Sequence, residues 1–531
     1  MRLRPAILRP TLRNRTTPTS KTMDPTRGAV AATSRFVLAL SVASLLSGCA
    51  SFSPDAGLSV ATRYANDELN KDVVKITDES VFLATQDRVG DLLRRPLSPN
   101  ASVQIALLNN RGLQAAFNDL GVSEAQYVQA TLPPAPQFSL TATSSILAFE
   151  AERQIAVSLL QLITLPLRIA IAEQRFQAAQ YRATEALLRL AAETRRQYYR
   201  TVAANQTVAF LEQALVTAES ASTFARSLGE TGALNKLEQA REHAFYTELG
   251  AQLAKARVQQ KVEREKLVRT MGLWGKERDF RLPRSLPRLP RRLESSDYIE
   301  AEALTKRVDL QTARFNLQAL AQQFGLTSTT GFVSAFDLGF AQSIEKTTTV
   351  TPNADGTVDV STERTPRPRG VALNFTIPIY DFGTTAVRGA REAYLGAANR
   401  LAERAVNARS EVREAYLRYR GQYEITRHYQ TSVLPLRKTI QDQALLQYSG
   451  MLIDVSQLII DARARILSNI QAIEAQRDFW IATTDVKAAI IGGGFGGAEA
   501  GAAGAPIGGE AAGGESAAAG GGNVAAATPG G

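Results

Sequence analysis

Two pairs of long segments carry apolar residues at a helical spacing. They are residues 167–227 with 234–271, and 384–447 with 452–491. Within them apolar positions recur every seven residues, in the series Leu237, Ala244, Ala251, Val258, then Tyr394, Leu401, Ala408, Ala415, then Ile459, Ile466, Ile473, Trp480. This spacing predicts long helices that pack together as in coiled coils. Pro435 should kink or break the third helix.

Shorter segments between these helices alternate between apolar and polar residues, which is typical of strands with two different faces. The predicted strands are 136–146, 152–163, 331–341 and 370–379. In the last strand, Val371, Leu373 and Phe375 share one face, while Ala372 and Asn374 share the other. Each strand has about ten residues, the length that crosses a bilayer when tilted.

A two-stranded hairpin leaves backbone groups unpaired along its edges, which is costly in lipid. We therefore expect these hairpins to close into a barrel with other copies of the chain. Threonine-rich segments at 347–351 and 357–362 predict a further hairpin that continues the second pair beyond the membrane. A soluble sheet also fits the alternation, and a coiled-coil dimer fits the helices alone. Aromatic-rich hairpins between such long helices favour the membrane barrel.

The two halves of the chain resemble each other. Residues 107–121 are similar to 304–318, and Gly232 and Gly450 lie at equivalent turns between the long helices. Each half is predicted to contain a helix, a β-hairpin and two long helices. The predicted order is a signal peptide (1–48), a lipidated N-terminal segment (49–100), the first repeat (101–271), a Pro/Arg-rich linker (272–296), the second repeat (297–491) and a disordered Gly/Ala-rich tail (492–531).

The N-terminal segment accounts for most of the net charge of +10, because residues 1–48 hold eight basic residues and one acidic residue. An apolar run at 36–46 follows, so the basic excess indicates secretion and not a nucleic-acid partner. The run ends at Leu46-Ser47-Gly48-Cys49, which resembles a bacterial lipobox. Cys49 is the only cysteine, and we expect it to carry a covalent lipid; a buried or free thiol is the alternative.

Residues for catalysis or metal binding are few. The chain has two histidines, His243 and His428, both in predicted helices and neither beside a nucleophile or ligand pattern. We therefore expect no enzyme, no metal site and no cofactor other than the lipid on Cys49.

Taken together, these elements resemble the TolC family of outer-membrane efflux proteins over about residues 100–491. The motifs that carry the resemblance are Lys306-Arg307-Val308-Asp309-Leu310, Ile377-Pro378-Ile379-Tyr380-Asp381-Phe382-Gly383, and Gly450 followed by Ile453-Asp454-Val455. The resemblance implies a mixed fold of all-α and transmembrane β-barrel parts. Long helices would form a periplasmic α-barrel, and two β-hairpins per protomer would complete the β-barrel of a homotrimer.

The resemblance also implies the function. The chain would be a passive exit duct in the outer membrane of a Gram-negative bacterium, working with a periplasmic adaptor protein and an inner-membrane pump. Gly232 and Gly450 would lie at the turns where the adaptor docks, and Asp454 and Asp461 would be candidates for the periplasmic gate. Asp454 also fits a solvated charge or an acid at a helix N-terminus. The alternative function is a structural or adaptor-like periplasmic coiled-coil lipoprotein, which would not need amphipathic hairpins.

Overall fold

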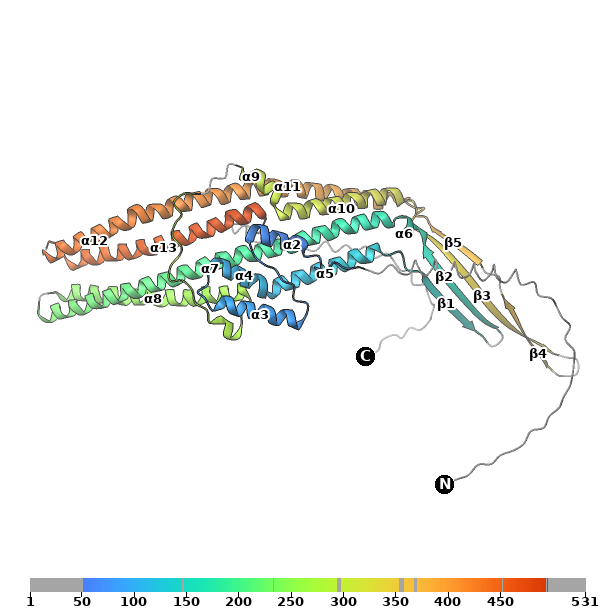
Figure 1. Cartoon of the computed structure of the whole chain (residues 1–531), viewed down its shortest axis with the longest axis horizontal. Helices are drawn as coiled ribbons and strands as arrows, with labels where there is room; N and C mark the ends of the chain where they lie inside the picture. The colour runs from blue at the N-terminus through green and yellow to red at the C-terminus, as the bar shows by residue number, and fades with distance from the viewer. Residues whose placement is uncertain are drawn as a thin grey trace, which may run out of the picture. The chain divides into compact units, whose positions relative to one another are not determined.

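The computed structural model describes residues 51–145, 148–232, 234–293, 298–352, 358–366, 370–450, 452–492 and 494. It divides into two compact units made of separate stretches of the chain (Figure 1). The sheet unit comprises Met1–Gly57, Asp119–Gln177 and Gln318–Tyr394, and the helical unit comprises Leu58–Asn118, Ala178–Leu317 and Leu395–Gly531. The predicted signal peptide, Cys49 and the tail after 494 lie outside the described residues.

Most of the described chain is helical. The helices are α2 (Ser59–Tyr64), α3 (Glu79–Leu93), α4 (Pro99–Asn109), α5 (Arg111–Thr131), α6 (Leu159–Ile163), α7 (Leu165–Glu230), α8 (Lys236–Met271), α9 (Ile299–Lys306), α10 (Val308–Thr330), α11 (Thr384–His428), α12 (Leu434–Ser449) and α13 (Val455–Ile491). Short π-helical turns occupy Ala65–Leu69 and Tyr429–Val433, and a 3-10 turn occupies Gly275–Arg278. The two predicted pairs of long helices are confirmed. In the described part of the chain, no helix combines the length and the apolar character needed to cross a bilayer.

The long helices follow from their sequence. Helix α7 has 66 residues and a length of about 100 Å at 1.5 Å per residue. Pro435 was expected to kink or break the third long helix; the backbone stays helical there, and a π-helical turn between α11 and α12 interrupts the α-helix just before the proline. Proline is tolerated in the first turn of a helix, where its missing N–H would have no intrahelical partner.

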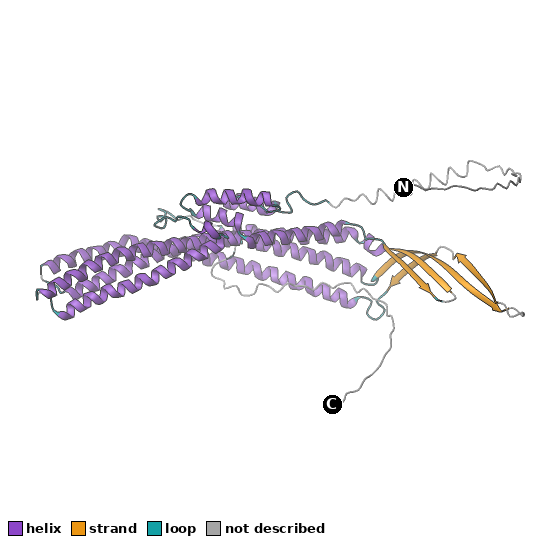
Figure 2. Cartoon of the chain, turned by 90° about the horizontal axis from the view of Figure 1, so that it is seen from below, coloured by secondary structure: helices purple, strands orange, loops and turns teal. Residues whose placement is uncertain are grey.

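Five strands form one antiparallel sheet, drawn in orange in Figure 2. They are β1 (Gln137–Ser144), β2 (Ala148–Ser158), β3 (Ala335–Pro352), β4 (Val358–Pro366) and β5 (Gly370–Thr376). The order is β1-β2-β3, and the long β3 pairs with β5 along its first half and with β4 along its second half. Thr348 is opposite Thr362, so the pairing of the threonine-rich segments is confirmed, while their turn at 353–357 lies outside the described residues.

Several predicted strand boundaries were wrong. Strand β1 ends at Ser144 and not at 146, and β2 begins at Ala148 and not at 152. Residues 159–163 form α6, because five residues with almost no polar position lose the alternation of a strand and leucine favours a helix. Strand β3 begins at Ala335 and not at 331. Strand β5 ends at Thr376, two residues before Pro378, which has no N–H for a sheet hydrogen bond.

The core of the helical unit lies where the short helices pack against the long ones. Its fully buried side chains are Val89 of α3, Ile105 and Leu108 of α4, Val202 of α7, and Leu267 and Met271 of α8. Helix α13 adds Ile473 to this cluster. The long helices are therefore held by lateral contacts near the ends of α4 and α8.

Two glycines end long helices in left-handed conformations against the backbone of another segment. Gly272 follows α8 with φ 71°, and a Cβ there would lie 2.8 Å from the carbonyl oxygen of Asn109. Gly492 follows α13 with φ 87°, and its Cβ would lie 3.0 Å from the backbone nitrogen of Val308. Glycine is required at both positions, because a side chain would strain the backbone and collide with it.

We predict that Gly272→Ala lowers the free energy of unfolding by ~2 kcal/mol, since alanine adds both a left-handed strain and a close contact. Urea unfolding followed by far-UV circular dichroism in detergent measures this. The control is Gly250→Ala, inside α8 with no atom within 4 Å of the new Cβ. Gly250→Ala should raise the free energy of unfolding by ~0.5–1 kcal/mol. Equal changes in the two variants would contradict the prediction.

Candidate functional site

The sheet has one apolar face. The register aligns three rows of apolar side chains across it: Phe336 with Phe375; Val157, Leu338 and Leu373; and Phe138, Ile155, Phe340 and Val371. The rings of Phe336 and Phe375 stack with centroids 4.7 Å apart. Phe138 is nevertheless 74% exposed. A contiguous exposed apolar face of this kind indicates a surface that contacts lipid or another chain.

The opposite face carries small and polar side chains. Its rows are Ser158, Asp337 and Asn374; Gln137, Ala156, Gly339 and Ala372; Ser139, Gln154, Ala341 and Gly370; and Thr141, Glu152 and Ser343. The predicted alternation between two faces is confirmed. Because the faces differ this strongly, one is suited to an apolar environment and the other to water.

The apolar rows occupy only part of the sheet. In the row after Phe138 and Phe340, Leu140 lies beside Arg153 and Gln342. Farther along, β3 and β4 pair through threonine and charged residues. The apolar band is therefore limited to the halves of the strands that adjoin the helices, and a polar extension follows it.

Both outer edges of the sheet are open within the described residues. Strand β1 pairs only with β2, and β4 and β5 pair only with β3. Each outer strand therefore presents backbone N–H and C=O groups that no other described strand pairs with.

The motif at the start of α11 forms the turn between β5 and that helix. Phe382 and Gly383 are left-handed, with φ 47° and 77°, and a Cβ on Gly383 would lie 2.0 Å from the carbonyl oxygen of Gly331. Asp381 accepts a hydrogen bond from the backbone of Gly383 at 3.0 Å. Two glycines thus bring the ends of α10 and β5 into direct backbone contact, which the sequence motif alone did not reveal.

The turns predicted for adaptor docking lie at the same end of the helical unit (Figure 1). Gly232, between α7 and α8, has φ 80° and needs to be glycine. Gly450, between α12 and α13, has φ −85° and ψ 5°, a conformation open to any residue. Both are confirmed as turn residues, and docking of an adaptor there stays a prediction.

The two gate candidates lie close together at the start of α13. Asp454 is the N-cap, and its carboxylate accepts a hydrogen bond from the backbone N–H of Gln457 at 2.9 Å. The side chain of Gln457 donates to Asp461 at 3.3 Å. Asp454 is exposed and Asp461 is half-buried. The interpretation of Asp454 as a helix N-terminal acid is confirmed, and a gating role stays a prediction that one chain cannot display.

A buried ion cluster holds the start of α10. Arg307 donates to both carboxylate oxygens of Asp309, at 3.0 and 2.7 Å, and pairs with Glu411 of α11 at 2.7 Å. Arg404 donates to Asp309 at 3.0 Å. Arg307 also donates to the carbonyl of Ala489 near the end of α13 at 3.1 Å. The sequence motif contains Arg307 and Asp309, but only the folded structure shows that they contact α11 and α13.

The cluster changes the titration of Asp309, which is 5% exposed. Burial by itself raises the pKa of this carboxyl, but the hydrogen bonds and charges of Arg307 and Arg404 outweigh burial and hold the pKa below its usual value. The ion pairs therefore contribute stability above the unfolded pKa, and this contribution is lost as the pH falls through the folded pKa.

We predict that Asp309→Asn destabilises the chain by ~3 kcal/mol at neutral pH, because it leaves Arg307 buried with one carboxylate fewer. Below about pH 4 the free energy of unfolding should fall less steeply in the variant than in the wild type. Urea unfolding across a pH series measures both effects. Asp442→Asn, exposed on α12, is the control. If the free energy of unfolding of Asp309→Asn fell with pH as steeply as that of the wild type, Asp309 would not be the group responsible.

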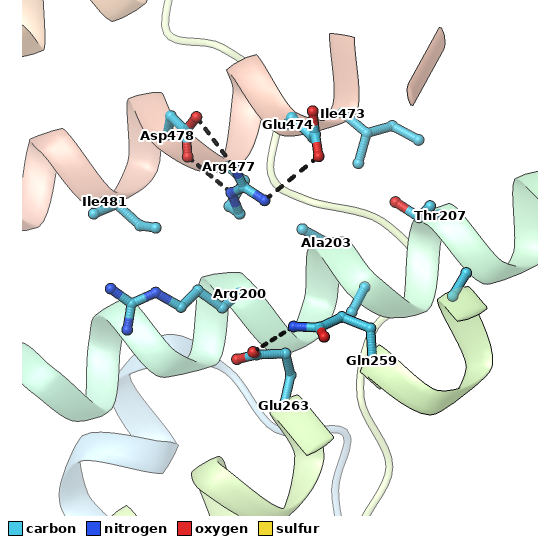
Figure 3. A pocket seen from close by; sticks show the side chains of 12 residues that line it. Arg200, Ala203, Thr207, Gln259, Glu263, Ile473, Glu474, Arg477, Asp478 and Ile481 are labelled. Atoms are coloured by element: carbon cyan, nitrogen blue, oxygen red, sulfur yellow. Dashed lines mark hydrogen bonds and ion pairs between the residues drawn. The ribbon is translucent and has the colours of Figure 1, made fainter. Parts of the chain in front are cut away.

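A cavity of about 380 Å³ lies between α7, α8 and α13 (Figure 3). Its charged side chains already have partners: Arg477 pairs with Asp478 at 2.8 Å, and Glu263 accepts from Gln259 at 2.8 Å. Neither histidine lines it. Among the described residues, no group of three or more His, Cys, Asp or Glu could hold a metal ion. Paired charges of this kind join helices and form no recognisable catalytic arrangement.

Comparison with known proteins places the fold. No family model and no curated protein matches the sequence of this chain. The CmeC outer membrane channel of Campylobacter jejuni matches with a TM-score of 0.62 and 17% identity, over 76% of this chain and 87% of that one. The MtrE outer membrane channel of Neisseria gonorrhoeae, in its open state, matches with a TM-score of 0.57 and 16% identity, over 74% and 88%. The chain has the fold of bacterial outer-membrane channels.

A membrane protein from Pseudomonas aeruginosa matches similarly, with a TM-score of 0.62 and 18% identity, over 74% of this chain and 93% of that one. Two of these three structures are outer membrane channels, and the third is a membrane protein. The fold expected from the resemblance to the TolC family is confirmed: a mostly helical chain with a small antiparallel sheet.

Proposed function

We propose that this chain is the outer-membrane channel of a tripartite efflux or secretion system. It would act as a passive exit duct for cargo that an inner-membrane pump delivers through a periplasmic adaptor protein. The observation that carries the proposal is the two-faced sheet with two open edges. The similar folds of the CmeC and MtrE outer membrane channels support it.

The open edges of the sheet favour a homotrimer. Backbone groups at an exposed edge cannot remain unpaired in lipid, so β1 of one copy would pair with β5 of the next and close a β-barrel. The apolar rows around Leu338 and Phe340 would face lipid, and the polar rows would line the water-filled lumen. A structural or adaptor-like coiled-coil lipoprotein is less well supported, because it leaves these apolar rows without a role.

The helix ends support an origin by internal duplication. In the first half, Asn109 donates to the carbonyl of Gly272 at 2.8 Å, where the break between α4 and α5 meets the end of α8. In the second half, Arg307 and Gly492 make the equivalent contact between α9, α10 and the end of α13. The same type of contact occurs at the equivalent position of both halves, and duplication of one unit is the simplest explanation.

A lipid on Cys49 would hold the N-terminus at the inner surface of the outer membrane. The nearby described residue Ser53 donates to Glu124 of α5 through its backbone nitrogen at 2.7 Å and its hydroxyl at 2.5 Å. Four residues span at most about 14 Å, so the lipid would remain close to the part of α5 that leads into β1.

Reconstitution tests the channel function directly. The purified wild type should run as a trimer in native mass spectrometry and conduct ions in planar bilayers. Leu373→Lys should prevent recovery of trimer from outer-membrane fractions, because lysine on the lipid face costs ~2–4 kcal/mol near the bilayer centre. Ala372→Lys, the adjacent residue on the polar face, should assemble normally. A monomeric, non-conducting wild type would rule out the proposal.

Acyl labelling tests the anchor. Metabolically supplied palmitate should label the wild type and not Cys49→Ser, because the chain has no other thiol. Labelling that persists in Cys49→Ser would show that the lipid is elsewhere.

Asp454→Asn tests the gate without disturbing the helix, because asparagine caps an N-terminus as well as aspartate does. Three copies of Asp454 around one axis would attract cations, so the variant should show a lower cation preference and weaker block by divalent ions. Asp461→Asn should have a smaller effect. Unchanged selectivity in bilayer recordings of Asp454→Asn would remove the residue from the gate.

A further inference from the structure

A second cavity, of about 570 Å³, lies in the helical unit between the α7–α8 hairpin and the α12–α13 hairpin. It exists because α7 lines it with the small residues Ala214, Ala218 and Ala221. Phe210 of α7 and Phe245 of α8 also line it, and Ile459 and Ile466 of α13 do so from the other hairpin. Its size is that of a small-molecule site, and its lining combines these apolar side chains with polar ones, among them Thr217, Gln441 and Asn469.

Glu242 of α8 lines this cavity and is only 7% exposed. Its Oε2 atom is buried and has no hydrogen-bond partner. Burial raises the pKa of this carboxyl, an effect that Arg463 only partly opposes. A buried carboxylate oxygen without a hydrogen-bond partner is costly, and it is satisfied by a proton or by a cation brought to it.

The neighbouring arginines are engaged elsewhere. Arg463 of α13 forms an ion pair with Glu248 at 2.9 Å and lies over the ring of Phe245 at 5.3 Å. Arg465 lines the cavity, but its guanidinium donates to Gln441 of α12. The described lining has two charged side chains. Arg465 has a hydrogen-bond partner, whereas the Oε2 atom of Glu242 has none.

We propose that this cavity binds an amphiphilic organic cation, with its amine beside Glu242 and its apolar body between Phe210 and Phe245. The amine would supply the missing partner of the carboxylate, and the aromatic rings would contribute both apolar contact and cation–π attraction. The helical unit would then bind a ligand between its two hairpins, in addition to its proposed role in a conduit. The inference does not depend on the proposed channel function, because every residue involved belongs to the helical unit.

Fluorescence polarisation with the purified full-length chain tests the proposal. The probes are rhodamine 6G, a lipophilic cation, and N-phenyl-1-naphthylamine, an uncharged lipophilic dye. Glu242→Gln keeps the shape and removes the charge, and should weaken binding of rhodamine 6G by about tenfold to a hundredfold while leaving the neutral dye unchanged. Glu219→Gln, exposed on α7, is the matched control and should bind both dyes as the wild type does.

Filling the cavity gives a second readout. Ala214→Leu, on a half-buried position of α7, should weaken both dyes, because it occupies space that either would need. Trimer yield and circular dichroism confirm that each variant folds. Equal affinity of rhodamine 6G for wild type and Glu242→Gln, or binding unaffected by Ala214→Leu, overturns the proposal. Normal conductance in the same preparations would show that the channel function stands independently.

The pH dependence of binding provides a further check. The cation needs an ionised Glu242, and the raised pKa means that protons compete for it, so the affinity of the wild type should fall as the pH is lowered. Of the other charged groups, Arg465 of α13 lines the cavity and Arg463 of α13 interacts with Glu242, whereas the cavity residues of α7 and α12 carry no charge. The neighbouring His243 of α8 has its ring near Ser222 and Tyr246. Glu242→Gln should show no such trend, and a trend of wild-type size in this variant would contradict the role of Glu242.

Discussion

Backbone hydrogen bonding at the edges of the sheet is the constraint on which the rest of the structure depends. Strands β1 and β5 have N–H and C=O groups without partners in the described chain, and the sheet between them has a continuous apolar face. An exposed apolar face is unfavourable in water, and an open edge is unfavourable in lipid, where no water can pair with its backbone groups. Closure with other copies of the chain satisfies both requirements together, which is why assembly and membrane insertion belong to one proposal.

The helical unit meets a different requirement. Helices as long as α7 and α8 have no compact core of their own, so they need lateral contacts at defined points. Small residues let helices approach one another. The left-handed glycines at 272 and 492 let the ends of α8 and α13 pack directly on the backbone at the end of α4 and at the start of α10. Buried ion pairs fix the relative position of helices far apart in sequence; Arg196 and Asp485, 2.6 Å apart, join α7 to α13.

Two buried carboxylates in this unit have contrasting surroundings. Asp309 is fully paired, and its arginine partners lower its pKa. Glu242 is nearly as buried, yet it has an oxygen without a partner and a raised pKa. The first arrangement stabilises the fold, whereas the second leaves a charge available to something outside the chain. Whether the oxygens of a buried carboxylate have hydrogen-bond or ion-pair partners thus distinguishes the structural Asp309 from Glu242 of the proposed binding site.

The sequence by itself determined the features that depend on local periodicity. Steps of seven placed the long helices, alternation placed the strands, and Pro435 placed the interruption before α12, because each pattern reports which face of a segment is buried. The sequence also placed Asp454 at a helix start. Only the tertiary structure decided that β2 pairs with β3, that 159–163 is helical, and that Asp309 meets Arg404. The strand pairing and the ion pair join residues that are far apart in the sequence, as Ala148 and Thr347 are, and the free energy of such pairing leaves no periodic trace in either segment alone.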